Sequence, residues 1–285
     1  MSRYRLVLLI VPVFALALFI GCSSDDSSSD EETALATKCD FADLKTYKDG
    51  FLTIGTDSPA YPPYFEDDDP SNGKGFESAL AYAIADQMGF EKSGIEWAEV
   101  PFNASYAPGS KKFDFDLNQI SITPAREKVV DFSVPYYTAS QGVLVGKGSD
   151  LEGISDIDEL KDATIGVQIG TTSLDAVQDE IQPNTDPKVF DNSNDVVSAL
   201  KQGQVDAIVV DLPQAIFLRD AIVSGSSVVG QFDAPGGDQW GALLEKGSEM
   251  TDCVSQAIEE LEDDGTLEEI TDEWMSEAAD APKLN

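Results

Sequence analysis

Short apolar runs alternate along most of this chain with segments whose apolar residues recur every three or four positions. Residues 51–55, 164–168 and 205–210 are runs of the first kind, and residues 113–122 are similar to them. Residues 76–87 and 250–261 are segments of the second kind. Apolar runs of this length are typical of buried strands, and the second spacing is typical of amphipathic helices. The alternation predicts an α/β fold of mainly parallel strands with helices on their faces, and a loop near Phe102.

The first 38 residues differ in composition from the rest. Arg3 and Arg5 precede an unbroken apolar run over residues 6–20, which is too short to span a bilayer and is typical of a signal peptide. The run ends at Gly21-Cys22 in a pattern similar to the bacterial lipobox, so we expect residues 1–21 to be removed and Cys22 to carry lipid. Residues 22–38 would then be an acidic, Ser-rich linker. A simple secreted signal and a terminal anchor are the alternatives.

Composition excludes several classes of function. The chain has 53 acidic and 18 basic side chains and no histidine, which gives a formal net charge of −35. Such a chain repels a phosphate backbone, so we expect no nucleic-acid partner. Without histidine, Ser-His-Asp and Cys-His catalysis and most zinc and haem sites are excluded, and we expect neither metal nor cofactor. We interpret the excess of acidic side chains as the solvated surface of an exported protein. The alternative is the acidic surface of a protein from a halophile.

One acid-rich stretch and the cysteines each allow two interpretations. In residues 66–75, Asn72 stands where a calcium loop has its invariant glycine and no glutamate closes the loop, so a solvated turn is favoured there. If Cys22 carries lipid, Cys39 and Cys253 remain as a pair. An even pair in an exported protein favours a disulfide between them. The alternative is that Cys253 is a small core residue on an apolar helix face.

Arg126 is the first candidate for chemistry. It is the only arginine between Arg5 and Arg219, and it follows a predicted strand that ends near Ser121. A guanidinium grips a carboxylate with two parallel hydrogen bonds, and the Ser121 and Thr123 hydroxyls would add donors. The alternative is a structural salt bridge to one of the many nearby acids.

Two further places complement Arg126. Gly170-Thr171-Thr172-Ser173 opens a predicted helix directly after a strand, where free N–H groups favour an anion. Asp211 ends an apolar strand, which is where open α/β sheets bind ligands, and its carboxylate would accept from an ammonium group. In both places the alternative is an ordinary helix N-cap. Taken together, the three places predict a site for a small zwitterion.

These motifs, in this order, resemble the extracytoplasmic solute-binding proteins of family 3, the polar amino-acid receptors of ABC importers. The resemblance covers roughly residues 40–278. The motifs that carry it are Gly75-Phe76-Glu77-Ser78-Ala79-Leu80, Ser121 to Arg126, Asp131-Phe132-Ser133-Val134-Pro135-Tyr136-Tyr137, Gly170-Thr171-Thr172, Val205 to Asp211, and Asp264-Gly265-Thr266-Leu267 to Trp274. It implies a two-lobed periplasmic-binding-protein fold with two hinge strands that closes on its ligand as a clamp. The first lobe would hold residues 40–138 and 238–285, and the second lobe residues 142–230.

The resemblance also implies roles for individual residues. The ligand carboxylate would be bound by Arg126 and the N–H groups of Ser121 and Thr172, beside Thr171. The ligand ammonium would be held by Asp211, the Ser121 hydroxyl and the Gln119 carbonyl. Tyr61 and Phe102 would sandwich the ligand side chain, and Asp57 would meet its polar end. Asn118 and Gln119 depart from the family pattern, because small residues are often found there.

The function that the resemblance implies is that of a monomeric, lipid-anchored receptor on the outer face of the cell membrane. It would capture a polar amino acid and deliver it to an ABC permease, without catalysis. One alternative is an exported enzyme similar to the cyclohexadienyl dehydratases, which would need a second cation for a dicarboxylate substrate. Another is a ligand sensor that serves no transport. The sequence leaves the identity of the amino acid open.

Overall fold

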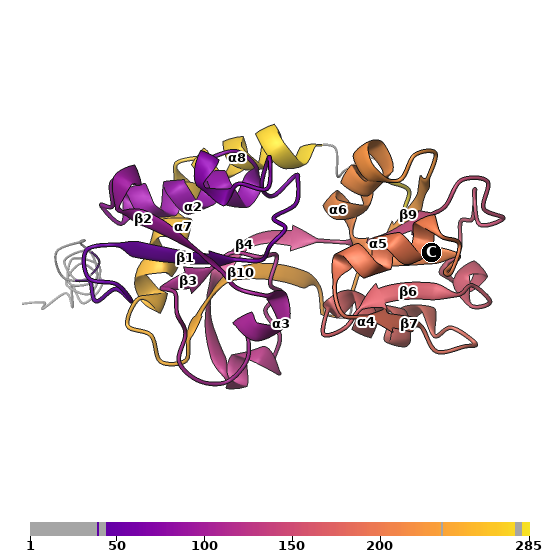
Figure 1. Ribbon diagram of the computed structural model, residues 1–285, viewed down its shortest axis with the longest axis horizontal. Coiled ribbons are helices and arrows are strands. Elements are labelled where there is room, and N and C mark those ends of the chain that lie inside the picture. Colours follow the sequence, from indigo (N-terminus) through magenta and orange to yellow (C-terminus); the bar gives the residue numbers. More distant parts are fainter. Residues whose placement is uncertain (1–38, 40–43, 235, 277–280) are drawn as a thin grey trace, which may run out of the picture.

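The computed structural model describes residues 39, 44–234, 236–276 and 281–285. They form two lobes that lie side by side along the long axis of the molecule (Figure 1). Each lobe is built on a five-stranded sheet, with strand order β2-β1-β3-β10-β4 in the first and β7-β6-β8-β5-β9 in the second. The α/β fold with two lobes is therefore as the sequence predicts.

The predicted apolar runs over residues 51–55, 164–168 and 205–210 each form a strand, with ends that differ from the prediction by at most two residues. Those of the first lobe are β1 (Leu52–Thr56), β2 (Ile95–Glu99), β3 (Phe115–Asp116), β4 (Val130–Ala139) and β10 (Asp238–Glu245). Those of the second lobe are β5 (Gln141–Val145), β6 (Ile165–Gln168), β7 (Lys188–Phe190), β8 (Ala207–Asp211) and β9 (Ser227–Phe232).

Helices cover both sheets. The first lobe carries α2 (Phe76–Gln87), α3 (Phe102–Ser105), α7 (Thr251–Asp263) and α8 (Thr266–Met275), and the second carries α4 (Thr172–Ala176), α5 (Ser193–Lys201) and α6 (Leu212–Phe217). The π-helical turns η5 (Val177–Ile181) and η6 (Leu218–Ile222) extend α4 and α6. The remaining short turns are the 3-10 helices η1 (Pro70–Asn72), η2 (Lys92–Gly94), η3 (Arg126–Lys128) and η4 (Ile157–Leu160).

Both sheets are mixed, whereas the sequence led us to expect mainly parallel strands. β1 pairs in parallel with β2 and β3, but β10 runs antiparallel to β3 and β4. In the second lobe β6 pairs in parallel with β7 and β8, while β5 runs antiparallel to β8 and β9. The antiparallel strands are those next to the crossings between lobes, where a connection replaces the helix that a parallel pair requires.

Two connections between strands join the sheets of the two lobes. Only Ser140 separates β4 in the first sheet from β5 in the second, and residues 233–237 separate β9 from β10. Both crossings lie at the narrow waist of the molecule (Figure 1). Two connections between the lobes, as the family resemblance implies, are thus present.

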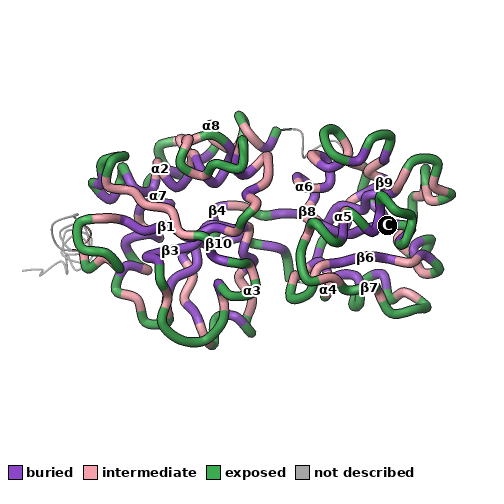
Figure 2. Tube along the Cα trace, viewed as in Figure 1, coloured by how far each residue is buried: buried purple, intermediate pink, exposed green. Residues whose placement is uncertain are grey.

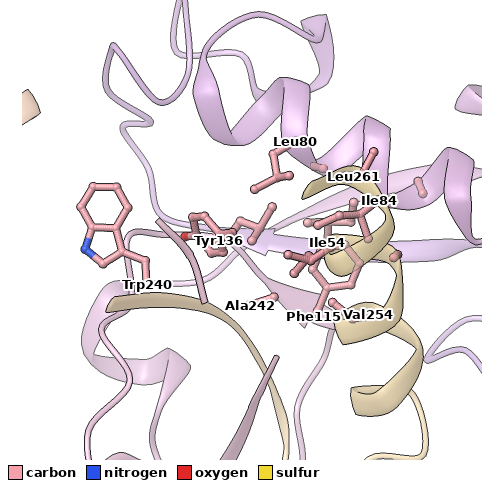
Figure 3. Close-up of a cluster of buried hydrophobic side chains, with 14 of the residues drawn as sticks. Ile54, Leu80, Ile84, Phe115, Tyr136, Trp240, Ala242, Val254 and Leu261 are labelled. Carbon is pink, nitrogen blue, oxygen red and sulfur yellow. The ribbon is translucent and has the colours of Figure 1, made fainter. Parts of the chain in front are cut away.

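Each lobe has its own hydrophobic core, so that the central strands are buried and the connecting loops are largely exposed (Figure 2). In the first lobe, side chains from β1, α2 and α7 meet, and Ile54, Leu80 and Val254 are fully buried there (Figure 3). Trp240 on β10 is also fully buried, with its ring 4.8 Å from that of Tyr137. These independent cores leave the space between the lobes to polar residues.

The end of the chain departs from the predicted domain boundaries. Residues 281–285 lie on the second lobe, where Leu284 N donates to Gln231 O at 2.9 Å and Ile157 N donates to Asn285 O at 3.2 Å. Leu284 packs in the second-lobe core against Gly230, which has no side chain to block it. The predicted first-lobe range 238–285 is therefore wrong at its end, because residues 281–285 pack on the second lobe.

Two local predictions also need correction. Residues 113–122 contain only the two-residue strand β3, because the chain leaves the sheet after Asp116 and turns through Gln119, whose φ is 48°. Phe102, expected in a loop, begins the short helix α3.

Cys39 and Cys253 are joined in a disulfide, as the sequence favoured. Cys253 lies on α7, so the bond stays within the first lobe and does not span the crossings. The signal-peptide prediction for residues 1–21, the linker at 22–38 and Cys22 lie outside the described residues. Within the described part of the chain, no helix is both long and apolar enough to cross a bilayer.

Candidate functional site

A cavity of about 560 Å³ lies between the two lobes. Its walls come from loops that follow β1, β3, β6 and β8, so strand ends of both sheets face it. Of the nine predicted ligand residues, only Arg126 does not line it. The eight that do are Asp57, Tyr61, Phe102, Gln119, Ser121, Thr171, Thr172 and Asp211. Residues separated by up to 154 positions in the chain are therefore gathered at one interlobe site, as predicted.

Arg126 lies directly behind the cavity wall. Its side chain is 8% exposed, and its two terminal nitrogens donate to Ser121 O at 2.7 Å and to Gly170 O at 2.9 Å. The guanidinium carbon lies 4.7 Å from the centre of the Tyr106 ring. Burial lowers the pKa of Arg126, while Tyr106 and Asp238 oppose that shift.

The salt-bridge interpretation of Arg126 does not hold among the described residues, since no carboxylate there pairs with it. Its guanidinium group instead donates hydrogen bonds to two main-chain carbonyls, one from each lobe. A buried charge is costly unless it has a partner of opposite sign. The arrangement therefore suits an external anion.

Asp211 is the last residue of β8, in the second lobe, and its side chain caps no helix. Its Oδ1 accepts from Gln141 Nε2 at 2.9 Å, and the same nitrogen donates to Asp238 Oδ2 at 2.5 Å. Burial raises the pKa of Asp211 well above its usual value, and the Asp238 carboxylate raises it further. The N-cap interpretation of Asp211 thus fails, and its carboxyl group remains available to a cation.

A chain of hydroxyls links this acid pair to Ser121. Thr172 Oγ1 donates to Asp238 Oδ2 at 3.0 Å and lies 3.2 Å from Ser121 Oγ. Because an ionised carboxylate only accepts and Thr172 has one hydroxyl hydrogen, Ser121 must be the donor to Thr172. Thr171 caps α4, accepting from Leu174 N at 3.2 Å, so the ordinary N-cap interpretation holds for its side chain.

Contacts across the cleft show that the lobes are closed on each other. The Tyr61 hydroxyl donates to the Asn194 side chain, and the Tyr106 hydroxyl, which donates to Asn103 Oδ1 at 2.7 Å, lies 3.4 Å from Gly170 O. Tyr61 and Tyr106 belong to the first lobe, and Asn194 and Gly170 belong to the second. Side chains of the two lobes are therefore in contact with each other at the cleft.

The far end of the cavity is polar and acidic. Asp57 accepts from Ser58 N at 2.7 Å and from Phe102 N at 3.2 Å. Gln168 accepts from the Ser193 hydroxyl at 2.7 Å. Among the described residues that line the cavity there is no lysine or arginine. This end suits a polar or cationic group of a ligand better than an anionic one.

Sequence reasoning missed several residues of the site. Tyr106, Asn194, Gln141 and Asp238 act through contacts between elements that are far apart in the chain, so no local pattern marks them. Glu77 stands inside a motif that the sequence analysis used only for its family resemblance. Its charge, beside mostly apolar side chains on the buried face of the helix, is the one signal that could have identified it.

A model of the bacterial extracellular solute-binding proteins, family 3, matches residues 52–277. The chain belongs to this family. It is similar to the L-cystine-binding protein TcyJ of Escherichia coli K12, at 31% identity over 81% of this chain and 85% of the relative.

Two solved structures are similar to it over most of their length. One is an ancestral arginine-binding protein bound to glutamine, at a TM-score of 0.68 and 33% identity over 80% of this chain and 99% of that one. The other is an ancestral amino acid-binding protein described as a precursor of cyclohexadienyl dehydratase, at a TM-score of 0.65 and 31% identity over 79% of this chain and 95% of that one. A family of extracellular solute-binding proteins accounts for two lobes closed over a polar cavity.

Proposed function

We propose that this protein captures a polar amino acid between its lobes and delivers it to an ABC permease in the membrane. Arg126, with the N–H groups of Ser121 and Thr172, would bind the ligand carboxylate. Asp211 and the Gln119 carbonyl would hold its ammonium group. Tyr61 and Phe102 would enclose the ligand side chain, and Asp57 would meet its polar end.

The observation that carries this proposal is the placing of two unpaired, opposite charges around one cavity. Arg126 is buried and has no carboxylate partner among the described residues, where its guanidinium donates to two main-chain carbonyls and lies against the Tyr106 ring, and Asp211 is a half-buried acid whose side chain caps no helix. Each affects the pKa of the other, which places both in one electrostatic field. A zwitterion with its charges on adjacent carbons satisfies both groups at once.

Closure of the two lobes is the change by which a permease would recognise that a ligand is bound. Because Arg126 and Ser121 belong to the first lobe and Asp211 and Thr172 to the second, only the closed form engages both ends of the ligand. The closed form would then be the state that the permease recognises. Lipid on Cys22 would hold the protein on the outer face of the membrane and raise its effective concentration there.

We infer that the cleft binds its ligand without converting it. The relatives reported above are described as binding proteins, and a dicarboxylate substrate would need a second cation that the described lining residues lack. Incubation of the purified protein with prephenate or arogenate tests this inference. Recovery of the compound unchanged is expected, and release of an aromatic product would assign an enzyme.

A thermal-shift screen of ligand-stripped protein against all proteinogenic amino acids tests the proposed function. A ligand at 100 times its dissociation constant adds about 2.7 kcal/mol to the free energy of unfolding. We expect at least one polar amino acid to give such a shift, and expect Arg126→Ala to abolish it. No shift with any amino acid would reject the proposal.

A further inference from the structure

Gln119 occupies a backbone conformation that favours glycine. Its φ is 48°, in the left-handed region where a Cβ atom is costly. A residue other than glycine persists there when neighbouring groups hold it in place. Gln119 lines the cavity, so the groups that fix its conformation also determine the shape of the ligand site.

Glu77 is the group that holds Gln119. Its carboxylate, from α2, is fully buried, and Oε1 accepts from the main-chain N–H of Gln119 at 2.8 Å. The side-chain amide of Gln119 donates to Oε2 of the same carboxylate. The Tyr136 hydroxyl, from β4, donates to Oε1. Both the backbone and the side chain of Gln119 are therefore fixed by one acid beneath the cavity floor.

These hydrogen bonds determine the direction in which the main-chain carbonyl of Gln119 points. The main-chain N–H of Gln119 donates to Glu77, and the described residues donate no hydrogen bond to the Gln119 carbonyl. A carbonyl in a cavity wall without a donor suits a ligand N–H group. The orientation of that carbonyl follows from the torsion angles that Glu77 holds.

We propose that Glu77 is a positioning residue of the ligand site, which holds Gln119 in the left-handed conformation so that its carbonyl meets the ligand ammonium. The ammonium belongs to the proposed function, on which this inference rests. Glu77 touches no ligand itself. Its contribution to affinity passes through one backbone conformation, and a glycine at position 119 would make that contribution unnecessary.

A double-mutant cycle tests the proposal. The affinities of L-arginine, L-glutamine and any amino acid that gives a larger thermal shift are measured by calorimetry for four proteins: wild type, Glu77→Gln, Gln119→Gly and the double variant. Gln keeps the shape of Glu77 but replaces one acceptor oxygen with a donor. We expect Glu77→Gln to weaken binding by about fivefold or more in the wild type, and by less than about twofold in the Gln119→Gly background.

Two further variants separate positioning from general effects. Gln119→Ala removes the amide but keeps the Cβ atom, so Glu77→Gln should still weaken binding in that background. Asp86→Asn removes one negative charge from the exposed face of the same helix and should leave affinity unchanged. An equal loss from Glu77→Gln in all backgrounds, or no loss in any, would overturn the proposal. Absence of amino-acid binding by the wild type would instead reject the proposed function.

A pH profile gives a second readout if Glu77→Gln does not fold. Burial raises the pKa of Glu77 to about 7, against the opposing effect of hydrogen bonds from Tyr136 and Gln119. Protonation turns one acceptor oxygen into a donor that faces donors, so wild-type affinity should fall as the pH drops through about 7. The ionisable groups that interact with Glu77 are Tyr136, Asp116, Tyr64 and Asp211.

The same profile for Gln119→Gly should lack this step. The acids and tyrosines around Glu77 remain in that variant, so any step that they cause would remain as well. A step of equal size near pH 7 in both proteins would contradict the proposal as directly as an additive cycle.

Discussion

Asp211 and Asp238 lie on different lobes, yet their carboxylates accept hydrogen bonds from the same nitrogen, Nε2 of Gln141. Gln141 is the first residue of β5 and Asp238 the first of β10, so the acid pair lies where the two crossings enter the sheets. The group expected to hold the ligand ammonium is thus bonded to the hinge of the clamp.

This pairing makes ligand affinity depend on pH. Burial, and next the Asp238 carboxylate, raises the pKa of Asp211, so a proton competes with the ligand ammonium for this acid. Affinity should fall as the pH drops through the raised pKa, by at most about tenfold per pH unit. Calorimetric titrations of one amino acid between about pH 4.5 and 8 measure this dependence.

Asp238→Asn should shift that dependence toward lower pH, because it removes a negative charge that raises the pKa of Asp211. Asp186→Asn, on an exposed loop of the second lobe, makes the same chemical change and should leave the profile as in the wild type. Identical profiles for Asp238→Asn and wild type would show that the two acids are not coupled.

The bond between Tyr61 and Asn194 should hold the mouth of the cleft closed. Tyr61→Phe keeps the ring but removes this bond, and a neutral hydrogen bond contributes about 0.5–1.5 kcal/mol. We therefore expect affinity to weaken by roughly two- to tenfold, mainly through faster ligand dissociation. Stopped-flow measurement of the dissociation rate checks this, and an unchanged rate would mean that the contact does not retain the ligand.

The disulfide should stabilise the first lobe without affecting the site. Cys39 and Cys253 lie beside the end of α2, and neither residue lines the interlobe cavity. Removal of a native disulfide typically costs about 2–5 kcal/mol. Urea unfolding of the Cys39→Ala, Cys253→Ala double variant should show a loss in that range, with unchanged ligand affinity. Weaker binding by the folded variant would contradict this separation.

The returning tail should stabilise the second lobe. Leu284 is buried against Gly230, and truncation of a buried leucine to alanine costs about 2–5 kcal/mol. Leu284→Ala should therefore lower the free energy of unfolding by an amount near the lower end of that range. Lys283→Ala breaks only an exposed ion pair with Asp233 and should change it by less than about 1 kcal/mol. Equal effects of the two substitutions would argue against a packing role for the tail.

The sequence predicted those features that local patterns determine. Arg126 was identifiable because it is isolated in a chain with few basic residues, and Asp211 because it ends an apolar strand. The crossings followed from the family resemblance. The first two features depend on residues that are near one another in the chain, and the crossings on motifs spread along most of it.

The features that the sequence did not predict depend on contacts between distant segments. The meeting of Asp211 with Asp238 requires both crossings and the closed arrangement of the lobes. The left-handed turn at Gln119 depends on Glu77, 42 positions earlier. The return of Leu284 to the second lobe depends on a space over Gly230 that only the folded sheet creates.

The most direct test of the account is a calorimetric titration of ligand-stripped wild type, Arg126→Ala and Asp211→Ala with the amino acid that gives the largest thermal shift. Each variant removes one of the two charges that would bind the ligand's opposite ends, and a charge-assisted hydrogen bond contributes about 1.5–3 kcal/mol. We predict one ligand per wild-type protein and a loss of affinity of roughly tenfold or more in each folded variant. Wild-type affinity in both variants would contradict the claim that Arg126 and Asp211 clamp an amino acid between the lobes.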